Sequence, residues 1–215
     1  MKTIKNACVA SLLLGTVALT AQAEDASCAK VRLGDPGWSD IAVTNGIAQF
    51  LLDGLGYKTE TQILAVPIIY AGLQKGQVDA FLGNWMPAQQ DNYDKFVDKL
   101  AQNLSGTEYT LAVPTYAYEA GVKTFADLDK FADQFDRKLY GIAAGSPANE
   151  SIRKMIAADE FGLGDWKLVE SSEQAMLVQV GRAVKRDKYV VFLGWTPHPM
   201  NVQHDMKYLK GGEQH

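Results

Sequence analysis

The chain has 215 residues, of which 47% are hydrophobic and 21% charged, and its formal net charge is −4. This composition is typical of a folded protein with one large lobe or two small ones, and it excludes a disordered or low-complexity chain. A nucleic-acid partner is not expected either, since such proteins usually carry a strong excess of basic residues.

The N-terminus has the pattern of a secretory signal peptide. Two lysines within the first five residues precede an apolar stretch at 7–19, and the sequence A-Q-A at 21–23 matches a cleavage site. We therefore expect a signal peptide at 1–23 and an exported, soluble mature chain that begins at Glu24. No later segment reaches the roughly 20 apolar residues of a transmembrane helix.

Strand and helix patterns alternate after the signal, which is typical of an α/β protein. A strand at 31–33 leads into a helix that Ser39 or Asp40 can cap. The apolar face that we expect this helix to bury consists of Ile41, Ile47, Phe50, Leu51 and Leu55. Next come a strand at 57–66, a helix at 68–75, a strand at 78–82, a helix at 89–104 and a strand at 109–113.

The second half begins after Pro114 with a stretch to residue 121 that we expect to cross between lobes. The elements expected beyond it are helices at 125–131, 148–161 and 173–186 and strands at 139–143, 167–170 and 189–193, with a turn at 145–147. Trp166, at the start of a strand, is expected to lie in the core.

Three tryptophans lie just past predicted strand ends. They occur in the motifs D-P-G-W-S-D at 35–40, F-L-G-N-W-M-P at 81–87 and F-L-G-W-T-P at 192–197. In open α/β sheets ligands bind at the carboxyl ends of the strands. We therefore expect Trp38, Trp85 and Trp195 to face a ligand in a cleft between two lobes.

Enzyme motifs have little support in this chain. It has no G-x-S-x-G, no phosphate-binding glycine loop and no H-E-x-x-H. His198 and His204 lie in one loop without a second cluster of ligands, so we expect no metal and no cofactor. An exported enzyme on a similar scaffold stays as an alternative, although it would need a nucleophile or base that the sequence does not show.

Aromatic rings gathered around a pocket favour a quaternary ammonium ligand, whose charge meets the π-faces and whose methyl groups need no hydrogen bond. Asp40 can add a negative charge beside the rings or can cap the helix. Asn149, near the start of a helix, can meet the polar end of the ligand or lie on the surface. Helix N–H groups favour the carboxylate of glycine betaine, whereas Asp40 favours the net positive charge of choline.

Together the three tryptophan motifs resemble those of the periplasmic choline-binding and glycine betaine-binding proteins of ABC importers, most closely the choline-binding members. The resemblance implies a two-lobed α/β solute-binding fold of the type II-like kind, which closes on its ligand as a flytrap does. It also assigns roles to six residues. The walls of an aromatic box would be Trp38, Trp85, Trp195 and Tyr116, with Asp40 facing the cation and Asn149 meeting the ligand's polar end.

The resemblance further implies a domain division and a function. The first lobe would span 24–115 and the second 116–195, while 196–215 would begin a return to the first lobe. Because such proteins usually continue further, we expect this chain to be truncated at its C-terminus, with the partner of Cys28 in the missing part. The expected function is capture of choline in the periplasm for the permease of an ABC importer. Glycine betaine or carnitine is the alternative ligand, and an enzyme acting on a choline derivative is the less favoured alternative.

Overall fold

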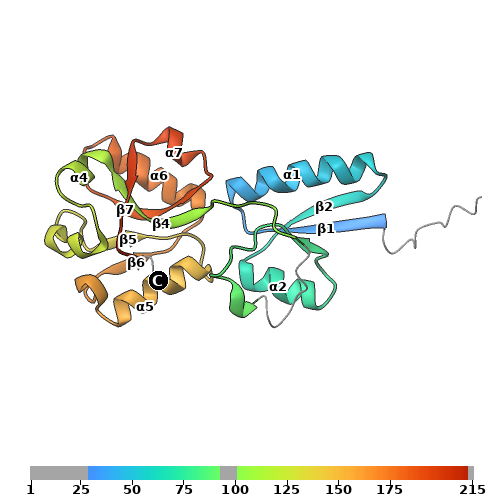
Figure 1. Ribbon diagram of the computed structural model, residues 1–215, viewed down its shortest axis with the longest axis horizontal. Helices are drawn as coiled ribbons and strands as arrows, with labels where there is room; N and C mark the ends of the chain where they lie inside the picture. The colour runs from blue at the N-terminus through green and yellow to red at the C-terminus, as the bar shows by residue number, and fades with distance from the viewer. Residues whose placement is uncertain (1–28, 93–100, 213–215) are drawn as a thin grey trace, which may run out of the picture.

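Two lobes, each built on its own β-sheet, lie next to one another along the long axis of the molecule (Figure 1). This computed structural model describes residues 29–92 and 101–212. The predicted signal peptide, Glu24, Cys28 and the middle of the helix predicted at 89–104 lie outside the described residues. The expectation of an α/β fold with two lobes is confirmed.

The first lobe contains a parallel sheet of three strands in the order β2-β1-β3. These strands are β1 (Lys30–Asp35), β2 (Lys58–Ile63) and β3 (Ala80–Phe81). Parallel neighbours need a crossover connection, which α1 (Ser39–Gly54) and α2 (Val66–Gln74) supply from opposite faces of the sheet (Figure 1). The carboxyl ends of β1 and β3 therefore lead toward the second lobe.

The face that α1 buries differs from the predicted one. Ile41 is buried, but Ile47, Phe50, Leu51 and Leu55 are all exposed, with 59–78% of their surface accessible. The helix is apolar on two sides, and its side toward the sheet carries the buried residues Ile41 and Asn45. Periodicity identifies apolar sides of a helix, whereas the position of the sheet decides which of them is buried.

The second lobe contains a mixed sheet of five strands in the order β6-β5-β7-β4-β8. The strands are β4 (Glu108–Pro114), β5 (Lys138–Tyr140), β6 (Lys167–Val169), β7 (Val191–Thr196) and β8 (Met206–Tyr208). The α-helices are α4 (Thr115–Glu119), α5 (Pro147–Ala157), α6 (Glu173–Val184) and α7 (Met200–Gln203). Short 3₁₀ turns at Phe125–Asp127, Asp129–Phe131 and Glu160–Gly162 complete the lobe.

Strand pairing corrects the predicted domain division at two places. β4 pairs with β7 and β8 in the second sheet, although it falls within the predicted first lobe at 24–115. The chain has therefore reached the second lobe before residue 115, and the stretch predicted to cross between lobes is the helix α4. β8 and the bridge between Thr124 and Lys210 hold the segment up to residue 210 in the second lobe, not in a return to the first.

Apolar side chains pack on both faces of the second sheet. Leu111 and Val113 of β4 lie in one buried cluster with Trp166, as expected for that tryptophan, while Ala112 between them lies in the other. This second cluster also contains first-lobe side chains, namely those of Trp38, Ile41, Val66 and Tyr70. One continuous apolar cluster therefore spans the boundary between the lobes, next to the site described below.

Candidate ligand-binding site

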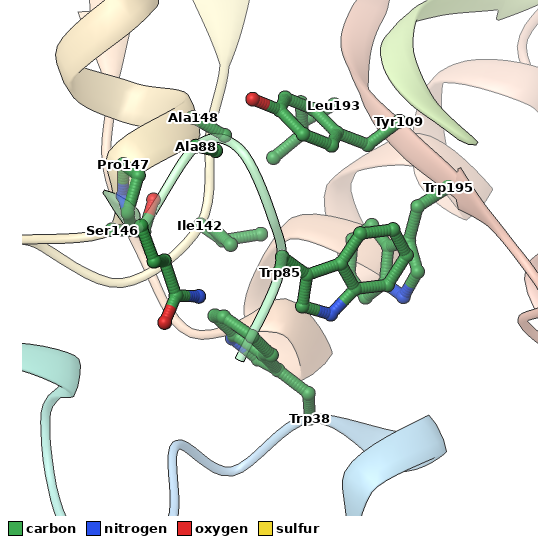
Figure 2. Close-up of a pocket in the computed structure, with 11 residues that line it drawn as sticks. Trp38, Trp85, Ala88, Tyr109, Ile142, Ser146, Pro147, Ala148, Leu193 and Trp195 are labelled. Atoms are coloured by element: carbon green, nitrogen blue, oxygen red, sulfur yellow. The ribbon is translucent and has the colours of Figure 1, made fainter. Parts of the chain in front are cut away.

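Four aromatic side chains surround a pocket between the lobes (Figure 2). Trp38 and Trp85 come from the first-lobe side, and Tyr109 and Trp195 come from the second sheet. The cavity among them measures about 40 Å³, several times the roughly 10–15 Å³ in which one water molecule fits. The other lining residues are Ala88, Gln89, Ile142, Ser146, Pro147, Ala148 and Leu193.

Trp38 is held at the junction of β1 and α1, where it occupies the N-cap position of the helix. The preceding turn contains Gly37 with a φ of +81°, a conformation that glycine adopts without strain. Asp35 Oδ1 accepts a hydrogen bond from the Gly37 N–H (2.7 Å), and Asn45 Nδ2 donates to the Gly34 carbonyl (3.2 Å). These bonds fix the turn, so Trp38 projects toward the second lobe from a rigid support.

Trp85 lies in the segment that follows β3, and α2 anchors this segment. The buried Tyr70 hydroxyl of α2 donates to Gln89 Oε1 (2.7 Å) and lies 3.0 Å from Asn84 Oδ1. Burial raises the pKa of Tyr70, so its hydroxyl stays protonated and able to donate. Both ends of the short segment that carries Trp85 are therefore tied to the same tyrosine.

Trp195 and Tyr109 are direct cross-strand partners in the antiparallel pair of β7 and β4. Residues opposite one another in such a pair project from the same face of the sheet, so both rings reach the pocket. Trp85 meets Tyr109 edge to face, with ring centroids 6.0 Å apart and planes at 79°. Tyr109 thus links the first-lobe wall to the second-lobe wall.

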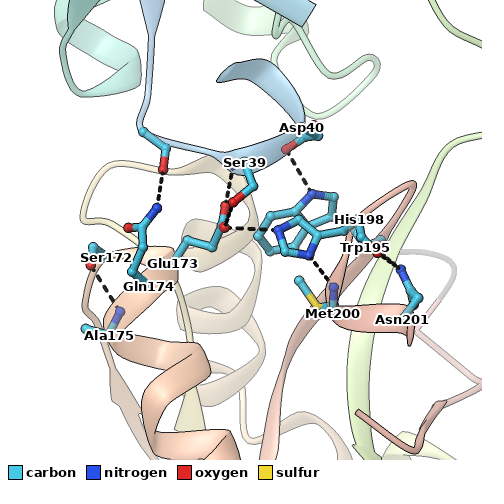
Figure 3. Close-up of polar contacts among 11 residues, drawn as sticks. Ser39, Asp40, Ser172, Glu173, Gln174, Ala175, Trp195, His198, Met200 and Asn201 are labelled. Atoms are coloured by element: carbon cyan, nitrogen blue, oxygen red, sulfur yellow. Dashed lines mark hydrogen bonds and ion pairs between the residues drawn. The ribbon is translucent and has the colours of Figure 1, made fainter. Parts of the chain in front are cut away.

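Asp40 lies behind the Trp195 ring and accepts a hydrogen bond from its indole Nε1 at 3.2 Å (Figure 3). Burial raises the pKa of Asp40, and the bond from Trp195 only partly opposes this effect. The structure therefore brings the predicted carboxylate next to the pocket. A cation bound among the rings would compensate part of the desolvation of this charge.

Tyr116 does not line the pocket, and this corrects its prediction as the fourth wall. Its hydroxyl donates to the Lys188 carbonyl (2.5 Å), and its ring packs at 6.0 Å from the ring of Tyr189. Tyr109 takes the fourth aromatic place instead. The sequence places Tyr109 in a strand, but only the pairing of that strand with β7 shows that it faces the pocket.

Asn149 also lies outside the pocket lining, because its side chain is fully buried and used within the second lobe. Its Oδ1 accepts from the Ile142 N–H (3.0 Å), while Nδ2 donates to the Ile142 carbonyl and to Glu170 Oε1, each at 2.8 Å. Asn149 therefore fixes the loop whose residues Ile142 and Ser146 line the pocket. The structure gives Asn149 a positioning role, and its contact with the ligand's polar end stays a prediction.

Within the described part of the chain, no lining residue of this pocket carries a positive charge. No group of three or more His, Cys, Asp or Glu in residues 29–92 and 101–212 could hold a metal ion. The helices described in those ranges are also too short or too polar to cross a membrane. The pocket therefore offers aromatic faces and one nearby carboxylate.

Residues 29–214 match the model of the OpuAC family, described as the substrate-binding domain of ABC-type glycine betaine transport systems. The chain belongs to this family. It is also 43% identical over 145 residues to the uncharacterized protein ORF1 of Chromohalobacter salexigens, covering 65% of this chain and 94% of that protein. The glycine betaine/carnitine transport binding protein GbuC of Listeria monocytogenes is 30% identical over 106 residues, 48% of this chain and 35% of that protein.

Solved structures of binding proteins share the fold. A choline-binding protein of an ABC transporter, in complex with choline, matches with a TM-score of 0.86 at 43% identity, over 89% of this chain and 68% of that one. An unliganded, semi-closed choline-binding protein matches with a TM-score of 0.78 at the same identity, over 87% and 67%. Lactococcal OpuAC, closed on glycine betaine, matches with a TM-score of 0.77 at 29% identity, over 86% and 71%.

These matches confirm the resemblance drawn from the three tryptophan motifs. They also confirm that the chain belongs among transporter substrate-binding proteins, not enzymes. The chain is thus a substrate-binding protein of a family that serves glycine betaine and choline transporters.

Proposed function

We propose that this protein is exported to the periplasm and captures choline in the pocket formed by Trp38, Trp85, Tyr109 and Trp195 for the permease of an ABC importer. The observation that supports it best is the convergence of four aromatic side chains from both lobes on one cavity. Aromatic faces attract a quaternary ammonium group, and each ring contributes about 1–2 kcal/mol once water is removed.

The charge distribution favours choline over glycine betaine as the ligand. The Asp40 carboxylate, bonded to Trp195 Nε1, contributes negative potential near the cation. Glycine betaine carries a carboxylate as well, and the lining residues described above include no cationic side chain to pair with it. The choline-bound relative with 43% identity is consistent with this preference.

Glycine betaine, or carnitine, is the second candidate on the same fold. It is favoured by the family's description and by the glycine betaine complex of lactococcal OpuAC. The start of α5, where Ser146 and Pro147 line the pocket, is the most suitable part of the lining for an anionic group, because a helix N-terminus has positive potential.

Calorimetric titration of the purified protein with choline, glycine betaine and carnitine tests the proposal. We expect choline to bind most tightly, and Trp85→Ala to weaken it by about tenfold or more through the loss of one ring. Tyr116→Phe is the control, because its ring packs on Tyr189 outside the pocket. Equal choline affinity of the wild type and a folded Trp85→Ala variant would contradict the aromatic site.

A further inference from the structure

The most deeply buried carboxylate at the boundary between the lobes belongs to Glu173, in the first turn of α6. Its side chain is 1% exposed. Oε2 accepts a hydrogen bond from the Ser39 backbone N–H (2.9 Å), and Oε1 accepts one from the Ser39 hydroxyl (2.5 Å) (Figure 3). A residue of the second lobe is therefore bonded twice to the start of α1 in the first lobe.

The imidazole of His198 holds the same carboxylate from the second-lobe side. Its Nδ1 accepts the Met200 backbone N–H at 2.9 Å, so the proton of the neutral ring lies on Nε2, 3.0 Å from Glu173 Oε1. Burial by itself raises the pKa of Glu173, but the adjacent His198 imidazole and the two hydrogen bonds from Ser39 outweigh burial and hold that pKa below its usual value. The carboxylate is thus ionised while the lobes are in contact.

Helix α1 lacks a cap from its own chain neighbours. Its N-cap residue is Trp38, whose side chain makes no capping hydrogen bond. The first N–H groups of a helix have no partner within the helix and carry positive potential, so they favour an anion. Glu173 meets this requirement from the other lobe by accepting the Ser39 N–H.

Two further bonds between the lobes flank the same short segment. Gln174 Nε2 donates to the Gly37 carbonyl at 3.0 Å, and Asp40 accepts from Trp195 Nε1. All these bonds join residues 37–40 to the second lobe, on both sides of Trp38. These interlobe bonds therefore add to the bonds within the first lobe that hold Trp38 in place.

We propose that Glu173 is an interlobe latch, that is, a positioning residue that caps α1 from the second lobe. By doing so it sets the closed fraction, the share of molecules whose lobes are closed around the ligand. Glu173 does not line the aromatic pocket. The apparent affinity for a ligand that needs the closed state falls in proportion to the closed fraction. The part of the proposal that concerns the ligand rests on the proposed function, whereas the contact itself does not.

The test compares Glu173→Gln with Glu150→Gln. Both residues are acids in the first turn of a second-lobe helix, but Glu150 is half exposed and pairs with Arg153 of its own helix. The first readout is the exchange rate of the Ser39 amide proton in the protein without ligand, measured by NMR. The second is the dissociation rate of choline, measured by stopped flow.

We expect the Ser39 amide to exchange about tenfold or more faster in Glu173→Gln and choline to dissociate faster by a similar factor, because Gln carries no charge and its single side-chain oxygen can accept only one of the two Ser39 bonds. Glu150→Gln should change neither rate. Unchanged Ser39 exchange in Glu173→Gln would overturn the latch, and so would faster exchange with unchanged choline dissociation. If the wild type binds no choline but the Ser39 amide still exchanges faster in Glu173→Gln, the latch is supported and only the proposed ligand is contradicted.

Ser39→Ala keeps the proposal testable if Glu173→Gln does not fold. This variant removes the hydroxyl bond to Glu173 and keeps the bond from the backbone N–H. We expect a smaller increase in the choline dissociation rate, about a few fold, since one of the two Ser39 bonds remains. A dissociation rate equal to that of the wild type would count against the latch.

Discussion

At the scale of single residues, the pocket combines rings that carry no charge with one carboxylate whose ionisation is costly. Asp40 is partly buried, and within residues 29–92 and 101–212 the side-chain donor to its carboxylate is the indole of Trp195. A neutral N–H stabilises a carboxylate less than a cation does. Asp40 is therefore a group whose protonation state should respond when a positively charged ligand arrives.

Choline affinity should depend on pH through Asp40. Because burial raises the pKa of Asp40, acidification protonates it earlier than an ordinary aspartate, and the attraction for a cation is then lost. We expect choline affinity to rise as the pH increases through this raised pKa. Titration calorimetry over a series of pH values measures this rise.

The matched variant is Asp40→Asn, which keeps an acceptor for Trp195 Nε1 but carries no charge. It should bind choline more weakly at neutral pH and should show a flatter pH profile. For the wild type without ligand, the free energy of unfolding should fall as the pH rises through the pKa of Asp40, the reverse of the trend in choline affinity. The reason is that a carboxyl whose pKa is raised in the folded state holds its proton more tightly there than in the unfolded chain. Identical pH profiles for the wild type and Asp40→Asn would exclude this role.

At the scale of elements, two turns fix the walls of the pocket. The turn between β1 and α1 presents Trp38, and the loop between β5 and α5 presents Ile142 and Ser146. Each turn is held by a buried amide, Asn45 in the first lobe and Asn149 in the second. Asn149 meets backbone groups with both its oxygen and its nitrogen, whereas Asn45 donates through its nitrogen, and both replace hydrogen bonds that regular structure would supply.

Asn149→Ala should destabilise the second lobe without removing a ligand contact. The substitution leaves the Ile142 N–H unpaired in a buried place, which costs about 1–3 kcal/mol, while the Ile142 carbonyl keeps its bond from the Ser171 N–H. We expect a lower free energy of unfolding in urea and, for the fraction that stays folded, choline affinity within a few fold of wild type. A large loss of affinity with unchanged stability would instead return Asn149 to the role predicted from the sequence.

At the scale of the whole molecule, the candidate ligand site lies where the lobes meet. The apolar cluster that contains Trp195 and Phe192 of the second sheet continues into Trp38 and Tyr70 of the first lobe. The polar bonds from Ser39 to Glu173 lie beside it. We therefore expect binding and closure to be coupled, because a ligand in this pocket would contact side chains of both lobes.

Choline should stabilise both lobes together. A ligand that binds the folded protein alone adds about 2.7 kcal/mol to the free energy of unfolding at a concentration of 100 times Kd. We expect urea unfolding with choline to shift as a single transition for probes in both lobes, such as the backbone amide NMR signals of β1 in the first lobe and of β5 in the second. A shift confined to the β5 signals would show that the first lobe takes no part in binding.

The sequence by itself determined the α/β alternation, the family and three of the four aromatic residues that line the pocket, because each of these depends on local patterns. A tryptophan after a strand end, in a motif such as D-P-G-W-S-D, is readable without knowing any strand partner. The sequence likewise predicts that Asp40, two residues after Trp38, lies beside the aromatic rings. Its bond to Trp195 agrees with that prediction of proximity, and its contact with a cation stays a prediction.

Only the tertiary structure decided the remaining features, because each depends on residues far apart in the sequence. The pairing of β4 with β7 put Tyr109 beside Trp195 and moved the lobe boundary ahead of residue 115. The position of the first sheet decided which apolar side of α1 is buried. The contact of Glu173 with Ser39 requires two helix starts to meet across the lobes, and no local periodicity records such a meeting.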